Sequence, residues 1–173
     1  AFGSSGQRCM ALSVLVAVGG VGSKIIDELK EAMKDFKVGP YEDEKNNFGP
    51  LISKEHKDNV IELISSAEKD GAEIVVDGRS LNLENNKYNY GYFLGATLIN
   101  NVKTNMKSYK EEIFGPVLQI INVSSFEEGI KVINNNPYGN GCCIFTGNGE
   151  AARTFSDKIN VGMVGINIPL PVP

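Results

Sequence analysis

The alternation of apolar and polar residues along the chain predicts short strands separated by helices. Residues 12–18 are apolar and rich in valine, the pattern of a strand covered on both faces. Further strand-length runs are predicted at residues 73–77, 92–99, 117–123, 141–146 and 161–168. The glycine-rich residues 19–22 end the first strand as a plain turn, because the Gly-Lys-Ser/Thr order of a phosphate-binding loop is absent.

Helical periodicity fills the intervals between these strands. Ser23 is predicted to cap the first helix, and Pro40 marks a point by which that helix has ended. Ser53 is predicted to cap a second helix, for which Gly71 is the natural stop. The apolar stripes expected on these helices consist of Ile25, Ile26, Leu29, Ala32, Met33 and Phe36, and of Val60, Ile61, Ile64 and Ala67.

The order of elements predicts the fold class. Ser125 and Glu128 form a capping box for a third helix, and residues 150–159 form a fourth. Residues 82–89 are polar and rich in asparagine, so we expect a loop that does not pack. Strands that alternate with helices imply parallel pairing through right-handed crossovers. We therefore expect an α/β fold with a mostly parallel sheet and flanking helices, with residues 1–173 forming one domain.

Composition narrows the classes of function. The chain has 173 residues, with 17 basic and 21 acidic side chains and a net charge of −4, so nucleic acid is not an expected partner. No apolar run approaches the roughly 20 residues of a membrane span. Three cysteines without a signal peptide favour a reducing compartment. Because the chain starts without methionine and stops in a Pro-rich segment, we expect an incomplete piece of a longer protein.

One cysteine has the surroundings of a nucleophile. Cys9 directly follows Gly6-Gln7-Arg8, where small residues let backbone amides approach the thiol and a guanidinium lies beside it. A nearby cation favours the reactive thiolate, and the amides can hold an oxyanion. An unpaired cysteine taken alone is more often an inert core residue, but the flanking glycine and arginine serve a thiolate rather than a core.

Two stretches together resemble the aldehyde dehydrogenase superfamily. The run Phe2-x-x-x-Gly6-Gln7-x-Cys9-Met10-Ala11 is similar to its cysteine signature, and Glu111-Glu112-Ile-Phe-Gly-Pro-Val117 is similar to its second signature. Finer features resemble the methylmalonate-semialdehyde dehydrogenase branch. These features are Gln7-Arg-Cys-Met-Ala-Leu-Ser13, Asn134-Asn-Asn-Pro-Tyr-Gly-Asn-Gly141 and the closing Asn167-Ile-Pro-Leu-Pro-Val-Pro173.

The resemblance assigns roles to four residues. It implies that Cys9 attacks an aldehyde, that the resulting thiohemiacetal loses hydride to NAD, and that a thioester remains on Cys9. It implies that Glu112 binds the nicotinamide ribose and that Phe114 backs the ring, whereas Glu111 is more structural. Arg8 either stabilises the Cys9 thiolate or holds a substrate carboxylate. The branch favours the second role, and therefore a short semialdehyde such as methylmalonate or malonate semialdehyde.

The same resemblance extends to the rest of the protein. In this branch coenzyme A discharges the thioester, and loss of carbon dioxide gives propionyl-CoA or acetyl-CoA. The NAD-binding half, the glutamate that activates water and the asparagine of the oxyanion hole would all precede Ala1. The family further implies a homotetramer, in the mitochondrial matrix of a eukaryote or otherwise in the cytoplasm, with any targeting region outside this chain. The alternatives are a hydrolytic NAD(P)-dependent aldehyde dehydrogenase that makes a free acid and a non-catalytic relative that uses the fold for binding or structure.

Three other residues are expected to have no catalytic role. Cys142 and Cys143 are adjacent on a predicted strand and point to opposite faces, which disfavours both a disulfide and a shared metal, so core packing is expected. The sequence therefore predicts no metal site. His56 is expected to be an exposed residue on the polar face of its helix, because no acid or nucleophile lies at a useful spacing.

Overall fold

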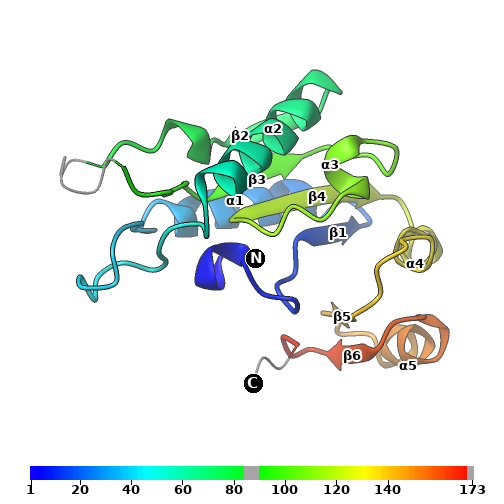
Figure 1. Ribbon diagram of the computed structural model, residues 1–173. Coiled ribbons are helices and arrows are strands. Elements are labelled where there is room, and N and C mark those ends of the chain that lie inside the picture. Colours follow the sequence, from blue (N-terminus) through cyan, green and yellow to red (C-terminus); the bar gives the residue numbers. More distant parts are fainter. Residues whose placement is uncertain (84–89, 171–173) are drawn as a thin grey trace.

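A computed structural model describes residues 1–83 and 90–170 and has a four-stranded sheet at its centre (Figure 1). The strand order is β1-β4-β3-β2, with β1 at Val14–Val18, β4 at Val117–Val123, β3 at Thr97–Asn100 and β2 at Glu73–Val76. The β1–β4 and β3–β4 pairs are parallel, whereas β2 runs antiparallel to β3. The structure therefore confirms a mostly parallel α/β fold. Most of the loop predicted at residues 82–89 lies outside the described residues.

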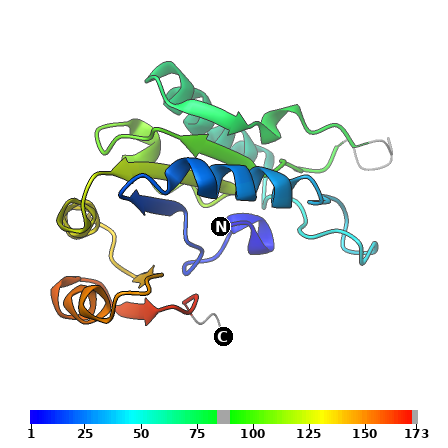
Figure 2. The ribbon, with the colours of Figure 1, turned by 180° about the vertical axis from the view of Figure 1, so that it is seen from behind.

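Helices cover both faces of this sheet. The helix α1 (Gly22–Met33) packs on one face, where Met33 joins Leu98 and Ile120 in a buried cluster (Figure 2). The opposite face is covered by α2 (Lys54–Lys69), α3 (Lys107–Lys110) and α4 (Phe126–Asn134). The buried residues of α2 are Val60, Leu63, Ile64 and Ala67, close to the predicted stripe.

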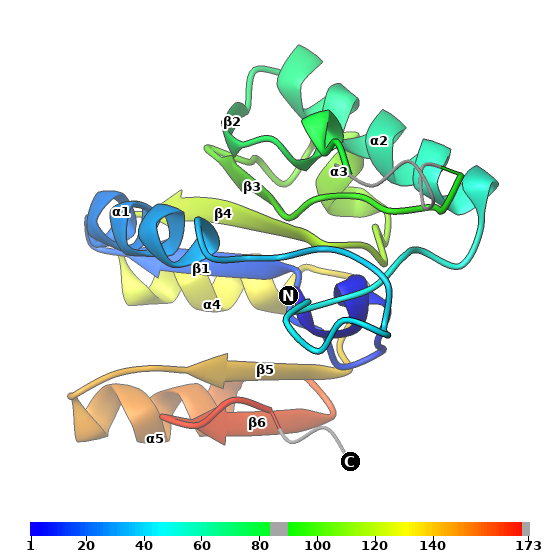
Figure 3. The same ribbon diagram turned by 90° about the vertical axis from the view of Figure 1, so that its left-hand side faces the viewer.

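A second, smaller layer lies beside β1. The strands β5 (Gly141–Ile144) and β6 (Met163–Ile166) form a parallel pair that α5 (Gly149–Lys158) connects (Figure 3). Asn134, at the end of α4, holds this layer by donating to the carbonyl of Lys158 at 2.8 Å and by accepting from the backbone N–H of Asn160 at 2.9 Å. Within the described residues, the two sheets are not hydrogen-bonded to each other as neighbouring strands.

The helix caps agree with the sequence at two positions and differ at one. The hydroxyl of Ser53 accepts the backbone N–H of His56 at 3.1 Å, and that of Ser125 accepts the N–H of Glu128 at 3.2 Å. The prediction that Ser23 caps α1 was wrong, because the helix begins at Gly22 and has no side-chain cap. A Cβ at Gly22 would lie 2.1 Å from Oδ1 of Asn122, so close packing against β4 fixes this end of the helix.

The strand predicted at residues 92–99 is mostly a loop, since β3 starts only at Thr97. A short 3₁₀ turn, η2 (Gly78–Ser80), takes the place of strand pairing there, and the N–H of Gly95 donates to the carbonyl of Gly78 at 3.0 Å. The two backbones are so close that a Cβ at Gly78 would lie 2.0 Å from the oxygen of Gly95. The apolar residues before β3 are buried without pairing in a ladder, since Leu94 lies in the core cluster with the α2 residues and Ala96 in the cluster with Met33.

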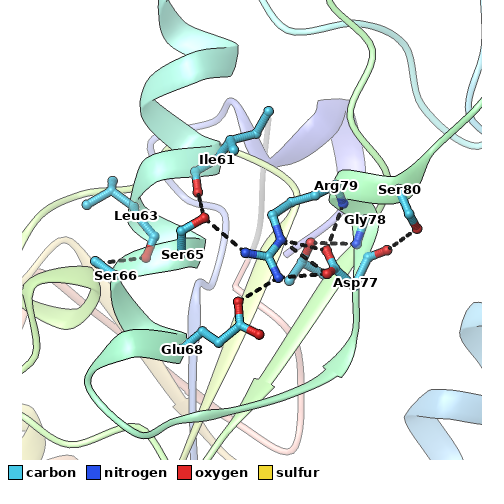
Figure 4. Close-up of polar contacts among 10 residues, drawn as sticks. Ile61, Leu63, Ser65, Ser66, Glu68, Asp77, Gly78, Arg79 and Ser80 are labelled. Carbon is cyan, nitrogen blue, oxygen red and sulfur yellow. Dashed lines mark hydrogen bonds and ion pairs between the residues drawn. The ribbon is translucent and has the colours of Figure 1, made fainter.

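An arginine network fastens α2 to the end of β2 (Figure 4). The guanidinium of Arg79 donates to Asp77 at 2.7 Å, to Glu68 at 2.9 Å and to the hydroxyl of Ser65 at 2.9 Å. The hydrogen bonds and charge of Arg79 lower the pKa of Asp77, and those with Asp77 and Glu68 raise the pKa of Arg79. The network ties together elements that the sequence separates by a turn.

Across residues 1–83 and 90–170, no helix combines the length and the apolar character that crossing a membrane requires.

Candidate active site

The residues before Cys9 form a left-handed turn. The turn η1 (Gly3–Gly6) has φ of 51° at Ser4, 57° at Ser5 and 69° at Gly6. Non-glycine residues avoid this region, at a cost of about 1–2 kcal/mol each, so the turn needs support from outside. Such strain is common beside reactive groups, where it fixes their direction.

Two side chains of the turn anchor it to the segment before α2. The hydroxyl of Ser5, which is 2% exposed, donates to the carbonyl of Gly49 at 2.6 Å. The amide of Gln7 donates to the carbonyl of Pro50 at 3.2 Å and accepts the N–H of Ile52 at 2.9 Å. Both the nitrogen and the oxygen of the Gln7 amide are thus hydrogen-bonded, which fixes the chain two residues before Cys9.

The topology brings the two sequence signatures together. Cys9 precedes β1, and Glu112 precedes β4, its parallel neighbour, so both lie at the same end of the sheet. The contact is direct, because a Cβ at Gly6 would lie 2.0 Å from the carbonyl oxygen of Gly115. Only glycine at position 6 permits this approach of two backbones.

Cys9 is exposed and lies in a tight turn of its own. The N–H of Ala11 donates to the carbonyl of Arg8 at 3.0 Å, which places Cys9 and Met10 at the two central positions of a β-turn. Nε of Arg8 donates to the hydroxyl of Ser4 at 3.1 Å, and Arg8 is itself exposed. The thiol is open to a reactant rather than packed into a core.

An open cavity of about 830 Å³ connects part of the predicted site. Cys9, Glu111 and Glu112 line it, and all three are exposed. Arg8 and Phe114 are not among its lining residues. The structure thus places on one cavity the thiol and the acid Glu112, which has no hydrogen-bond or ion-pair partner within residues 1–83 and 90–170, an arrangement in which an electrophile and a hydroxyl-rich cofactor can meet.

His56 is less exposed than the sequence predicted. It is half-buried, and its Nε2 lies 2.8 Å from the carbonyl oxygen of Phe114. Because a carbonyl oxygen only accepts, Nε2 must carry the proton in this contact. Phe114 has φ of 51°, and its side chain is 36% exposed. The expectation that His56 is exposed was therefore wrong, since it is half-buried and holds the strained turn that follows Glu112, whereas its lack of a catalytic role stays a prediction.

The other two cysteines differ from Cys9 in their surroundings. Cys142 and Cys143 are half-buried on β5, and neither forms a disulfide. Burial raises the pKa of Cys142 to about 11 and also raises the pKa of Cys143. Both thiols therefore stay protonated near neutral pH, which agrees with packing and not with nucleophilic attack.

Sequence reasoning missed Asn140. Its Nδ2 donates to the carbonyl oxygen of Cys9 at 2.9 Å, across 131 residues of sequence. Asn140 also lines the cavity. The one available signal was the unusual asparagine-rich run 134–141, which carried a resemblance but suggested no contact.

Comparisons with known proteins identify the family of the chain. The sequence model of the Aldehyde dehydrogenase family matches residues 1–172. The acylating, mitochondrial methylmalonate-semialdehyde/malonate-semialdehyde dehydrogenase of Bos taurus is 49% identical over 169 residues, which are 98% of this chain and 31% of that protein. The malonate-semialdehyde dehydrogenase of Pseudomonas aeruginosa is 48% identical and is matched over 100% of this chain and 35% of its own length.

Solved structures give the same result. The crystal structure of methylmalonate-semialdehyde dehydrogenase from Oceanimonas doudoroffii has a TM-score of 0.96 and 56% identity, covering 100% of this chain and 35% of that one. Betaine aldehyde dehydrogenase from Staphylococcus aureus, solved in complex with NAD+, has a TM-score of 0.91 and 30% identity, covering 98% and 33%. The chain thus spans about a third of the length of these relatives. Matched almost from end to end, and with its two signatures packed against each other, the chain belongs to the aldehyde dehydrogenase family.

Proposed function

We propose that the protein containing this chain oxidises methylmalonate or malonate semialdehyde with NAD and transfers the acyl group to coenzyme A. The observation that supports this most directly is the exposed Cys9 thiol on the same cavity as Glu112. The relatives named for this acylating reaction, at 49% identity in Bos taurus, supply the substrate class.

Cys9 is the nucleophile in this proposal. Its sulfur forms a bond to the aldehyde carbon, and the carbonyl oxygen becomes an alkoxide that nearby backbone N–H groups stabilise. NAD, when bound, supplies the acceptor for the hydride that leaves this carbon. A thioester then remains on Cys9. The thiolate of coenzyme A attacks the thioester carbonyl and releases the Cys9 thiolate, while the substrate carboxylate leaves as carbon dioxide and a proton takes its place.

Glu112 and Phe114 suit the nicotinamide end of the cofactor. The carboxylate of Glu112 is exposed, faces the cavity and, within residues 1–83 and 90–170, accepts no hydrogen bond, so its oxygens remain free for ribose hydroxyls. Phe114, two residues further on, is partly exposed. The imidazole of His56 donates a hydrogen bond to its backbone carbonyl and so holds the backbone in place. We assign ribose binding to Glu112 and support of the ring to Phe114.

Arg8 would select substrates that carry an acid. It is adjacent to Cys9 in sequence, and only its Nε has a partner among the described residues, so the terminal nitrogens of the guanidinium fork are available to a carboxylate. A short semialdehyde attacked by Cys9 has its acid group within a few atoms of the reacting carbon. In this proposal the guanidinium binds that acid group, which a simple aldehyde lacks.

The proposal extends to the setting of the whole protein. We infer a homo-oligomer, a tetramer by family resemblance, in the mitochondrial matrix if the source is a eukaryote and in the cytoplasm otherwise. The word mitochondrial in the name of the Bos taurus relative supports the first setting.

The test is an assay of the full-length protein with NAD and methylmalonate semialdehyde, with and without coenzyme A, alongside Cys9→Ala. We expect propionyl-CoA only when coenzyme A is present, and less than a hundredth of the turnover from Cys9→Ala, because alanine fits the same space but cannot attack. Release of a free acid without coenzyme A would make the enzyme hydrolytic. Turnover by Cys9→Ala above a tenth of the original would refute the nucleophile.

A further inference from the structure

We propose that Asn140 is a positioning residue for the reaction of Cys9, because it fixes the peptide between Cys9 and Met10 and with it the backbone N–H beside the thiol. This inference rests on the proposed role of Cys9. It assigns a function to a residue from the small β5–β6 layer, at the opposite end of the chain from the cysteine.

The turn that carries Cys9 leaves one peptide unsecured. In the turn from Arg8 to Ala11, the hydrogen bond between the outer residues fixes the ends but not the central peptide. Type I and type II turns differ by a flip of that peptide, which changes ψ of the first central residue from about −30° to about +120°. That residue is Cys9. Because φ of the first central residue is about −60° in both turn types, a flip would leave its Cβ in place but would turn over the N–H of Met10, one of the backbone amides beside the thiol.

Asn140 contacts the carbonyl oxygen that would move if this peptide flipped. Its Nδ2 donates to the carbonyl oxygen of Cys9 at 2.9 Å, and that oxygen belongs to the central peptide. A flipped peptide would carry the oxygen away and leave the amide without this partner. The hydrogen bond therefore favours one of the two turn conformations over the other.

A second contact joins the same two segments. A Cβ at Gly141 would lie 3.0 Å from the terminal methyl of Met10 and 2.5 Å from Cδ1 of Leu170. Met10, the other central residue of the turn, is therefore packed directly over the residue that follows Asn140. The turn and the start of β5 contact each other through both a polar and an apolar pair.

The support of Asn140 is itself firm, although its side chain is exposed. The N–H of Gly162 donates to the carbonyl of Gly139 at 2.8 Å, and a Cβ at Gly162 would lie 3.0 Å from the carbonyl oxygen of Asn140. Gly141 then starts the paired strands opposite Met163. The amide extends from a backbone held on both sides, as a positioning group requires.

Cys9 thus lies between two sets of anchors. Gln7 fixes the chain before it through Pro50 and Ile52, and Asn140 fixes the chain after it. The first set comes from the segment before α2, and the second from the small layer. A change in how the small layer sits against β1 would therefore reach the nucleophile through Asn140.

The experiment compares Asn140→Leu and Asn140→Asp in the full-length protein. Leucine removes the donor, and aspartate keeps the shape but presents oxygens that repel the Cys9 carbonyl. We expect kcat at saturating NAD to fall about ten- to a hundredfold in both, since a small misplacement of a reacting group costs that much. The KM for NAD should change less than about twofold, because no part of Asn140 is assigned to the cofactor.

The rate at which iodoacetamide alkylates Cys9, followed by mass spectrometry across pH, distinguishes a positioning role of Asn140 from damage to the thiol itself. A small reagent reaches an exposed thiol from many directions, so the plateau rate should stay within about twofold of the original in both variants. The matched control is Asn46→Asp, which breaks a similar amide-to-carbonyl bond, to Pro40, in a loop whose residues 40–46 do not line the cavity. It should lower the melting temperature and leave kcat unchanged.

Unchanged kcat in Asn140→Leu and Asn140→Asp would overturn the proposal, and so would an equal loss of kcat in Asn46→Asp. A drop in alkylation as large as the drop in kcat would also overturn it, because the thiol itself would then be impaired. The role of Cys9 is tested separately: if Cys9→Ala keeps its turnover, the proposed function fails whatever the Asn140 variants do.

Discussion

At the scale of single residues, the proposed function assigns the choice of aldehyde to Arg8. We expect Arg8→Leu to lower kcat/KM for carboxylated semialdehydes by about 2–3 kcal/mol more than for propanal, because a charge-assisted hydrogen bond is lost only where a carboxylate is present. Kinetics with both substrates measure the difference, and Arg8→Lys, which keeps the charge but not the fork, should fall in between. Equal losses for both aldehydes would mean that Arg8 serves the thiolate of Cys9 instead.

Candidate site residues could be proposed where a local motif carries them. Cys9 and Glu112 were proposed from their neighbours in sequence, and the structure places both on one cavity. The partner of His56 is 58 residues away, and that of Asn140 is 131 residues away. Both partners are backbone carbonyls, which leave no trace in the sequence. The supporting contacts of the site were therefore invisible until the fold brought them together.

At the scale of elements, periodicity predicted most helices and the central strand well. The strand β4 has the predicted bounds, Val117–Val123, because it is apolar and buried on both faces. Residues 92–96 are equally apolar but form no ladder, since Gly78 and Gly95 pack backbone to backbone at that edge. Hydrophobicity reports burial, and only the partner decides whether a buried segment becomes a strand.

The network of Arg79 predicts a local contribution to stability. Arg79→Met should weaken the attachment of α2 to β2 by about 1 kcal/mol, a modest value because Glu68 and Asp77 remain largely accessible to water. Hydrogen exchange of the α2 and β2 amides in the full-length protein measures this loss. The control is Lys34→Met, which removes a fully local pair with Glu31 on α1 and should change little.

The sign of the pH dependence follows from Asp77. Its pKa in the folded protein lies below the usual value near 4, so its stabilising effect is complete above that value and is lost as pH falls through the folded pKa. The difference between the original protein and Arg79→Met should therefore shrink in acid. A difference that stays constant from pH 7 to about pH 2 would contradict a role for the Asp77 carboxylate.

At the scale of the whole molecule, the separation of the two sheets could not be predicted from sequence. Residues Val14 and Val16 of β1 and Cys142 and Cys143 of β5 line the same cavity from opposite sides. Among the residues that the structure describes, β1 pairs only with β4, and β5 only with β6. Each strand reads as an ordinary buried strand, and sequence pattern alone does not reveal which neighbour covers it.

Strands at the sheet edges, such as β1 and β5, each have one neighbour only among the described residues. Together with the short span of the chain, these open edges predict the cofactor binding and the association of the 173 residues in isolation. By resemblance, the residues that hold the cofactor pyrophosphate lie outside them. A ribose contact to Glu112 worth about 1–3 kcal/mol does not offset the roughly 4–15 kcal/mol lost on immobilising a dinucleotide. We therefore expect no NAD binding in calorimetry and no turnover, with the full-length protein as the positive control.

Light scattering should show self-association, because unpaired apolar strand edges recruit further strands. A monodisperse monomer that binds NAD at micromolar concentration with one-to-one stoichiometry would show that the cofactor site lies largely within this chain.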